Sequence, residues 1–308
     1  MSDLIPLLIA QTGLSESDIL GIIRNAPRRY KTYAIEKRNG GERVISQPAR
    51  ELKALQRILM AELLAKLPVH VAATAYREGI SIKANALAHA QNGPIMKFDF
   101  ENFFPSITAR DWRTYCERRS LFRSEVDLWL TTNVFFKKDY ARSSLVLAIG
   151  APSSPLLSNI LMHEFDEKVA EIVRKDQVTY TRYADDLTFS AKRTGFLTKV
   201  ESNLRKIIRE LKSPSLSINE AKTVLATTKY KRFVTGLVLT NDGAVSIGHD
   251  RKRIVRAAVH RALTGKLSSG EKRELAGFLA FIHDVEPDFL VRIENKYGAG
   301  IIRRLQEQ

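Results

Sequence analysis

The chain of 308 residues has an ordinary globular composition, with 44% hydrophobic and 27% charged residues, and its formal net charge of +15 indicates a polyanionic partner. Nucleic acid is favoured over a membrane surface, because no basic amphipathic helix with an aromatic face, no apolar stretch of about 18 residues and no signal-peptide pattern is evident. The single cysteine, Cys116, excludes an intramolecular disulfide and argues against a zinc site built from cysteines, so a cytoplasmic protein is expected.

Hydrophobic periodicity and turn residues predict an α+β chain with a central antiparallel sheet and a basic helical C-terminal part. An early hairpin is expected around Asn39-Gly40-Gly41, and a later one around Asn241-Asp242-Gly243. In chain order, the predicted elements are short helices over 1–27, strands over 33–37 and 43–46, a helix over 50–67, a strand over 95–100, a helix over 107–119, strands over 178–183 and 187–190, a helix over 198–211, a hairpin of 233–239 with 245–247, and helices from 250 onward.

Three aspartates interrupt apolar segments in the centre of the chain. Asp99 lies within an apolar run that predicts a buried strand, and Asp185 and Asp186 lie between two strand-like runs. Burying an ionised carboxylate is costly unless it is paired or binds a metal ion. Two-metal phosphoryl transfer requires carboxylates that converge from separate strands. An Asp-Asp pair can also be an ordinary turn, but here the strand-turn-strand context and the preceding Asp99 favour a metal-dependent polymerase.

Four segments resemble motifs of the reverse transcriptase family. The stretch FDFENFFPSI (98–107) is similar to the first metal-binding motif, and YADD (183–186) matches the Y-x-D-D motif. The stretch GAPSSPLLSN (150–159) resembles the motif that contacts template and nucleotide, and NEAKT (219–223) resembles the motif that follows Y-x-D-D. Together they imply an RNA-directed DNA polymerase.

Two further elements resemble the retron reverse transcriptases of bacteria in particular. Asn85-Ala86-x-x-His89 matches the N-A-x-x-H element, and Val234-Thr235-Gly236 matches the V-T-G element. Each specifies only three residues, but both occur in the correct order on either side of the polymerase motifs. The resemblance covers about residues 30 to 300.

The resemblance implies an α+β fold with right-hand polymerase architecture, which comprises fingers, a palm with an antiparallel sheet, and a helical thumb. The expected divisions are an N-terminal helical extension over 1–29, fingers over 30–94, a palm with some fingers elements over 95–232, and a thumb and RNA-recognition region over 233–308.

The resemblance also implies the metal site. Asp99 and Asp185 would ligate two Mg²⁺ ions, and the carbonyl oxygen of Phe100 would complete a metal shell. Asp186 would be required but would coordinate less directly.

Five residues are expected to bind the incoming nucleotide. Lys37 and Arg43 would hold the triphosphate from the fingers hairpin, although plain surface charge is an alternative for both. Phe104 falls at the steric-gate position, where a ring would collide with a 2′-hydroxyl, and its alternative is core packing. Gly150 permits a close backbone approach to nucleotide or template. Lys222 is either a general acid for pyrophosphate or a solvent-facing lysine.

One position departs from the family pattern. The residue before Gly150 is commonly a glutamine whose amide contacts the nucleotide, and here it is Ile149. An apolar side chain cannot make that hydrogen bond, so nucleotide affinity or fidelity is expected to differ, whereas the metal site is not affected.

RNA contacts are expected in two places. Asn85 and His89 are candidates from the retron element, although a lone histidine is more often a satisfied core or surface residue. The basic C-terminal helices offer a face suited to RNA phosphates, with a plain solvated helix face as the alternative. The candidates on this face are Arg251, Arg253, Arg256 and Arg261.

The resemblance implies a retron reverse transcriptase that uses dNTPs to copy part of its cognate structured non-coding RNA into a short single-stranded DNA (msDNA), primed from a guanosine 2′-hydroxyl. It also implies anti-phage defence with an effector that is a separate protein. Two alternatives stay open: another bacterial reverse transcriptase, of group II intron or diversity-generating type, and a non-catalytic RNA-binding scaffold that sequesters an effector. Intron enzymes usually carry maturase and endonuclease regions for which this length leaves no room, and the intact carboxylates argue against a pure scaffold.

Overall fold

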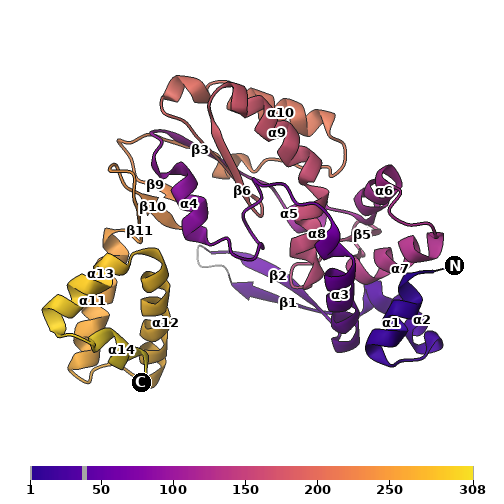
Figure 1. Ribbon diagram of the computed structural model, residues 1–308, viewed down its shortest axis with the longest axis horizontal. Coiled ribbons are helices and arrows are strands. Elements are labelled where there is room, and N and C mark those ends of the chain that lie inside the picture. The colour runs from indigo at the N-terminus through magenta and orange to yellow at the C-terminus, as the bar shows by residue number, and fades with distance from the viewer. Residues whose placement is uncertain (1, 37–39, 308) are drawn as a thin grey trace.

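The computed structural model describes residues 2–36 and 40–307 (Figure 1). Within these residues, four small antiparallel sheets are surrounded by helices, which confirms the predicted α+β class. None of the helices described is both long enough and apolar enough to cross a membrane.

The central sheet has four antiparallel strands in the spatial order β6 (Thr179–Tyr183), β7 (Asp186–Ser190), β3 (Ile95–Asp99) and β8 (Val224–Ala226). Two helices cover one face of it, α9 (His163–Lys175) on β6 and α10 (Val200–Glu210) on α9 (Figure 1). The buried residues Phe165, Val169 and Val173 recur along a single face of α9, so packing on the sheet explains the amphipathic pattern of that helix.

The predicted first hairpin is formed by β1 (Tyr30–Glu36) and β2 (Glu42–Pro48), which pair antiparallel from Tyr30 opposite Pro48 onward. Pro48 ends the second strand, because proline cannot donate a backbone hydrogen bond. The turn residue Asn39 lies outside the described residues. The elements that follow or flank the hairpin are α3 (Arg50–Glu62), α5 (Phe103–Ser106), α6 (Ala109–Arg119), β4 (Lys137–Asp139), β5 (Ser144–Val146) and α8 (Ser153–Leu161).

The N-terminal helices α1 (Leu4–Thr12) and α2 (Glu16–Asn25) pack beside α7 (Glu125–Phe135) at one end of the molecule. The side chain of Ser15 caps α2 by accepting a hydrogen bond from the backbone N–H of Asp18 at 3.2 Å. The buried carboxylate of Asp127 on α7 accepts a hydrogen bond from the backbone N–H of Asp3 at 3.0 Å, which ties the first helix to the rest of the chain.

The C-terminal part begins with a three-stranded sheet of β9 (Arg232–Val234), β10 (Leu237–Leu239) and β11 (Val245–Ser246). The prediction of one strand over 233–239 is wrong, since Thr235 and Gly236 have φ values of 47° and 78° and form a two-residue turn. Positive φ at both central residues matches the twist of a tight hairpin. Four helices then complete the chain: α11 (His249–Leu263), α12 (Ser269–Val285), α13 (Pro287–Tyr297) and α14 (Ile301–Gln306).

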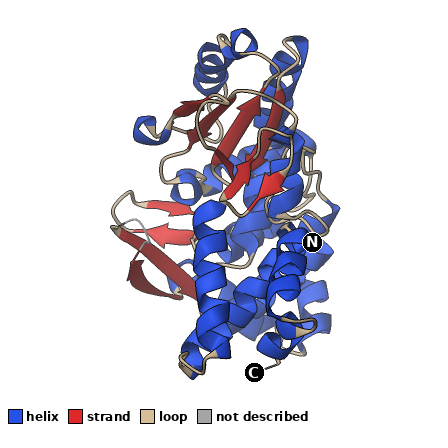
Figure 2. Cartoon of the chain, turned by 90° about the vertical axis from the view of Figure 1, so that its left-hand side faces the viewer, coloured by secondary structure: helices blue, strands red, loops and turns tan. Residues whose placement is uncertain are grey.

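Two separate hydrophobic cores hold these parts together. One runs from the N-terminal helices through the central sheet, and the other joins the three-stranded sheet to α11–α14. Helix α4 (Ile82–Ala90) belongs to the second core through Ala86 and Ala90, although it precedes the central sheet in sequence. Figure 2 shows the helical C-terminal lobe in front, with the strands of the hairpin and of the central sheet beside and above it.

Candidate active site

The central sheet brings the three aspartates together. Asp99 is the last residue of β3 and lies directly opposite Asp186, the first residue of β7. The tight turn of Ala184 and Asp185 joins β6 to β7, and the backbone N–H of Phe100 donates to the carbonyl oxygen of Asp185 at 3.2 Å. The carboxylates predicted from separate strands are therefore neighbours at one end of the sheet.

The turn that carries Asp185 has a strained backbone. Ala184 is buried and has a φ of 58°, a value that non-glycine residues rarely adopt. Such strain costs roughly 1–3 kcal/mol and persists only where surrounding contacts impose it. Behind the turn, the fully buried Arg182 donates a hydrogen bond from Nη1 to the carbonyl oxygen of Ala184 at 3.0 Å.

Clustering changes the protonation equilibria of these carboxylates. Burial and the negative charge of Asp99 raise the pKa of Asp185 to about 6. Burial also raises the pKa of Asp186, with Lys97 opposing the shift and Asp99 adding to it. The ammonium group of Lys222 lies 2.8 Å from Oδ1 of Asp99, and this hydrogen bond raises the pKa of Lys222. A cation is thus already held against one carboxylate of the cluster.

The donor set fits a magnesium site. Carboxylate and backbone carbonyl oxygens are the ligands that Mg²⁺ prefers, and the raised pKa values indicate that nearby positive charge does not fully compensate the carboxylates. In the described part of the chain, no three acidic, histidine or cysteine side chains are already arranged around a common metal position. The aspartates therefore supply the correct chemistry without a preformed cage.

Phe104 lies next to Tyr76, a residue that belongs to none of the predicted motifs. Its half-buried ring is 6.4 Å from the ring of Tyr76, which is 47% exposed and has a φ of 60°. Burial and the charge of Asp185 raise the pKa of Tyr76, whereas the charge of the exposed Arg43 opposes this shift. No motif singles out this tyrosine, because only the fold brings it to the carboxylates. Lys37, the other predicted fingers residue, lies outside the described residues.

Gly150 is required by its contact with the hairpin of β1 and β2. Its φ is 112°, and a Cβ added there would lie 2.9 Å from Cγ2 of Ile45 and 3.1 Å from the carbonyl oxygen of Ser46. The backbone N–H of Ser46 also donates to the carbonyl oxygen of Ile149 at 2.7 Å. The loop before α8 is therefore fixed against β2, and the half-buried Ile149 takes part through its backbone.

The burial of Asn85 and His89 does not agree with the predicted RNA contacts. Asn85 is 2% exposed, and His89 is fully buried between the hydroxyls of Ser190 and Thr181, at 2.6 and 2.8 Å. Burial, with a smaller effect of Lys97, lowers the pKa of His89 to about 4, so this imidazole is neutral near pH 7. His89 therefore links α4 to the central sheet, which agrees with the alternative of a satisfied core histidine.

The helix that carries the first retron-type element contacts the hairpin that carries the second. Helix α4 packs on β9 and β10, and the hydroxyl of Thr235 donates to the carbonyl oxygen of Ile82 at 3.1 Å. Nη1 of Arg251 donates to the carbonyl oxygen of Gly236 at 2.7 Å, so the first basic residue of α11 holds the same turn. Helix α4, the turn and α11 all belong to the second core, so these contacts hold that core together.

The other predicted RNA-binding arginines line the exposed side of α11. Arg256 lies over the ring of Phe289, 5.1 Å from its centroid. Arg253 is 3.6 Å from Asp250, and Arg261 is 3.2 Å from Glu271. Such exposed ion pairs are weak, so Asp250 and Glu271 do not hold Arg253 and Arg261 firmly.

Comparison with known proteins gives matches over almost the whole chain. Residues 35–243 match the family model described as reverse transcriptase (RNA-dependent DNA polymerase). The retron Ec83 reverse transcriptase of Escherichia coli is 35% identical, with 90% of each chain covered, and the retron Ec73 reverse transcriptase of the same species is 31% identical, with 94% of each covered. Among solved structures, telomerase from Candida albicans matches with a TM-score of 0.49 at 14% identity, over 91% of this chain and 61% of the telomerase chain.

Proposed function

This chain belongs to the bacterial retron-type reverse transcriptases and is an RNA-directed DNA polymerase, and from that premise we propose that it copies part of a cognate structured RNA into a short single-stranded DNA by two-metal phosphoryl transfer. Membership confirms the predicted resemblance and the right-hand polymerase fold. The observation that carries the proposed mechanism is the convergence of Asp99, Asp185 and Asp186 at the end of β3 and β7.

In this proposal, Asp99 and Asp185 bind two Mg²⁺ ions together with the carbonyl oxygen of Phe100, and Asp186 supports them from β7. When bound, such ions lower the pKa of the attacking 3′-hydroxyl and neutralise charge on the leaving pyrophosphate. Two contributions come from the chain itself. Asp99 and Asp186 are held in register by the sheet, and the ammonium group of Lys222 stands 2.8 Å from Asp99, within reach of a phosphate placed at the carboxylates.

The proposed nucleotide site lies on the side of Tyr76. Arg43 and Lys37 would bind the triphosphate from the fingers hairpin, and the ring of Phe104 would exclude a 2′-hydroxyl. Gly150 would bring the loop before α8 close to the base pair, since its contact with Ile45 and Ser46 fixes this loop. Lys222 would donate a proton to the leaving pyrophosphate.

At the level of the whole system, we propose priming from a guanosine 2′-hydroxyl, an msDNA product, and anti-phage defence together with a separate effector protein in the cytoplasm. The family resemblance supports this proposal, and the net charge of +15 supports its RNA partner. The divisions that go with it are the helical extension (1–29), fingers (30–94), palm (95–232), and a thumb and RNA-recognition region (233–308). The exposed arginines of α11 would bind RNA phosphates.

The test is primer extension on a poly(rA) template with an oligo(dT) primer, dTTP and Mg²⁺. Asp185→Asn removes a charged metal ligand and is expected to abolish dTTP incorporation while RNA binding is retained. The control is Asp176→Asn at the C-terminal end of α9, which is expected to be as active as the unmodified protein. Activity of the Asp185 variant would contradict the metal-ligand role. Absence of incorporation by the unmodified protein, with RNA still bound, would favour the scaffold alternative.

A further inference from the structure

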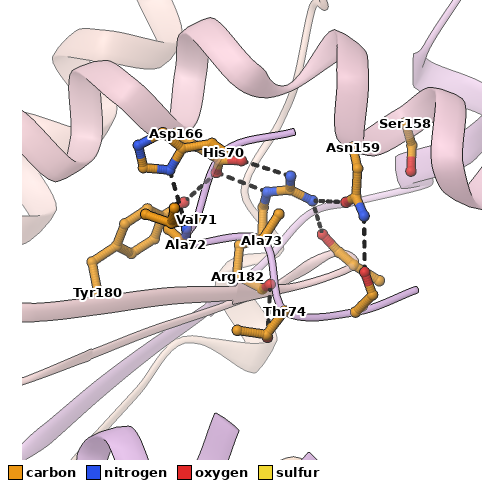
Figure 3. Close-up of polar contacts among 12 residues, drawn as sticks. His70, Val71, Ala72, Ala73, Thr74, Ser158, Asn159, Asp166, Tyr180 and Arg182 are labelled. Atoms are coloured by element: carbon orange, nitrogen blue, oxygen red, sulfur yellow. Dashed lines mark hydrogen bonds and ion pairs between the residues drawn. The ribbon is translucent and has the colours of Figure 1, made fainter. Parts of the chain in front are cut away.

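Arg182 on β6 is a fully buried arginine behind the catalytic turn. Its Nε and Nη2 donate to the two carboxylate oxygens of Asp166 on α9, at 2.8 and 2.7 Å (Figure 3). The hydroxyl of Tyr180 donates to the same carboxylate at 2.7 Å. Burial alone would lower the pKa of Arg182, but Asp166 outweighs it and the pKa is raised, so the guanidinium stays charged.

The remaining nitrogen of this guanidinium connects two parts of the active site. Nη1 donates to the carbonyl oxygen of Ala184 at 3.0 Å and to Oδ1 of Asn159 at 3.1 Å. The amide of Asn159, on α8, then donates to the carbonyl oxygen of Ala75 at 2.8 Å. One side chain is thereby bonded directly to the turn that carries Asp185, and through Asn159 to the residue before Tyr76.

The backbone of Arg182 reinforces the same connection. Its N–H donates to the carbonyl oxygen of Ala72 at 2.7 Å, and its carbonyl oxygen accepts from the N–H of Thr74 at 2.8 Å. Ala73 forms a parallel bridge with Arg182, so the segment 72–74 runs along the edge of β6 (Figure 3). Tyr76 follows this segment by two residues and lies beside Phe104.

Stability alone does not account for this arrangement. Replacing a buried ion pair with uncharged groups of similar size is often neutral or stabilising, so a buried pair is weak support for a fold. The hydrogen bond to Ala184 acts on a residue whose positive φ must be imposed by its surroundings. We propose that Arg182 is a positioning residue that fixes the turn of Asp185 and, through Asn159, aligns it with the nucleotide side of the site at Tyr76. This inference rests on the proposed metal-ligand role of Asp185.

The experiment separates positioning from folding with two variants. Arg182→Met with Asp166→Asn removes both buried charges, keeps an oxygen that can accept from Tyr180, and is expected to fold with a Tm close to that of the unmodified protein. Arg182→Lys keeps one charge but cannot bond Asp166, Ala184 and Asn159 together. A displacement of about 1 Å at the reacting groups costs roughly 100-fold in rate. The double variant is therefore expected to lose about 100-fold in kcat for dTTP incorporation, with a much smaller change in KM, and Arg182→Lys about tenfold.

A matched control is Arg232→Lys, because Arg232 is also a buried arginine that donates to backbone carbonyls, those of Gly93 at 2.7 Å and Thr240 at 2.8 Å. It lies away from the turn, so its variant is expected to lower Tm while kcat at 25 °C changes less than twofold. A second readout is Mn²⁺ binding by electron paramagnetic resonance, which is expected to weaken in the Arg182 variants and not in the control.

The outcomes distinguish the two proposals. If the folded double variant, or a folded Arg182→Lys variant, has unchanged kcat and Mn²⁺ affinity, the positioning role of Arg182 is overturned. The same holds if the Arg182 variants lower Tm and change kcat by less than twofold, as is expected of the control. If Asp185→Asn retains activity, the proposed metal site itself fails, whatever the Arg182 variants do.

Discussion

At the scale of one residue, the partly buried carboxylate of Asp185 lowers the stability of the fold, and the same carboxylate is a proposed metal ligand. Its pKa is about 6 in the folded protein, against an ordinary value of 3.8 for a solvated aspartate, so folding disfavours the charged carboxylate. Below pH 3.8 the carboxyl is protonated in both the folded and the unfolded chain and there is no cost. The free-energy cost of ionising the partly buried carboxyl grows as the pH rises from 3.8 to about 6, and it is fully present above that pH. Without divalent metal, Asp185→Asn should therefore raise the free energy of unfolding at pH 7.5 by on the order of 1–3 kcal/mol.

Urea unfolding in EDTA at pH 7.5 and pH 4.5 measures this effect. The stabilisation by Asp185→Asn should be large at pH 7.5 and small at pH 4.5. At pH 7.5, Mg²⁺ should reduce the difference in free energy of unfolding between the variant and the unmodified protein, because it binds only the unmodified protein. Equal stabilisation by Asp185→Asn at both pH values would show that burial does not raise the pKa of Asp185.

Tyr76 supports a second prediction at the residue scale. Its ring lies beside Phe104, so Tyr76→Ala removes a neighbour of the proposed steric gate and gives that ring room to move. We expect the preference for dTTP over UTP, measured as the ratio of kcat/KM values, to fall by about tenfold. Tyr76→Phe keeps the ring and should retain the preference. Equal discrimination by all three proteins would place the selective contact elsewhere.

At the scale of elements, Gly150 couples the loop before α8 to the hairpin of β1 and β2. Gly150→Ala places a Cβ 2.9 Å from Ile45 in a backbone conformation with φ of 112°, and backbone atoms of Ser46 leave little room to adjust. We expect a loss of about 1–3 kcal/mol in the free energy of unfolding. Gly195→Ala is the control, because a Cβ there meets nothing within 4 Å, and its effect should stay within about 0.5 kcal/mol. Equal losses in urea titrations would refute the close approach.

Some of the strands and turns could be predicted from the sequence, and others could not. The paired strands around Asp185 follow from apolar runs that flank a turn, because β-compatible residues and turn residues act locally. The break at Thr235 and Gly236 escapes sequence patterns, since the residues on both sides are apolar and only the φ angles separate them. Arg182 escapes them too, because an arginine is expected at the surface until its partner Asp166, 16 positions earlier on another element, is placed.

At the scale of the whole molecule, helix α11 presents a cluster of basic residues on the solvent side of the second core. The arginines of α11 are exposed, and within the described part of the chain only two of those named have an acidic partner on the same lobe, Asp250 for Arg253 and Glu271 for Arg261. The Lys252–Glu286 pair is largely buried and packs beneath them, so the helix is anchored on one side and open on the other. An RNA bound on this face would release counterions from its phosphates in proportion to the arginines that contact it.

Replacing Arg251, Arg253, Arg256 and Arg261 with glutamine should therefore weaken RNA binding at low salt and flatten its salt dependence. The slope of log K against log salt should decrease in magnitude by about 0.7–0.9 for each arginine that contacts a phosphate. The charge-matched control replaces four exposed basic residues on α9 and α10, namely Arg174, Lys175, Lys206 and Arg209. Filter binding from 50 to 300 mM KCl gives both slopes. If the control lowers the slope as much as the α11 variant, RNA binding reflects net charge alone; a larger effect at α11 assigns the contact to this helix.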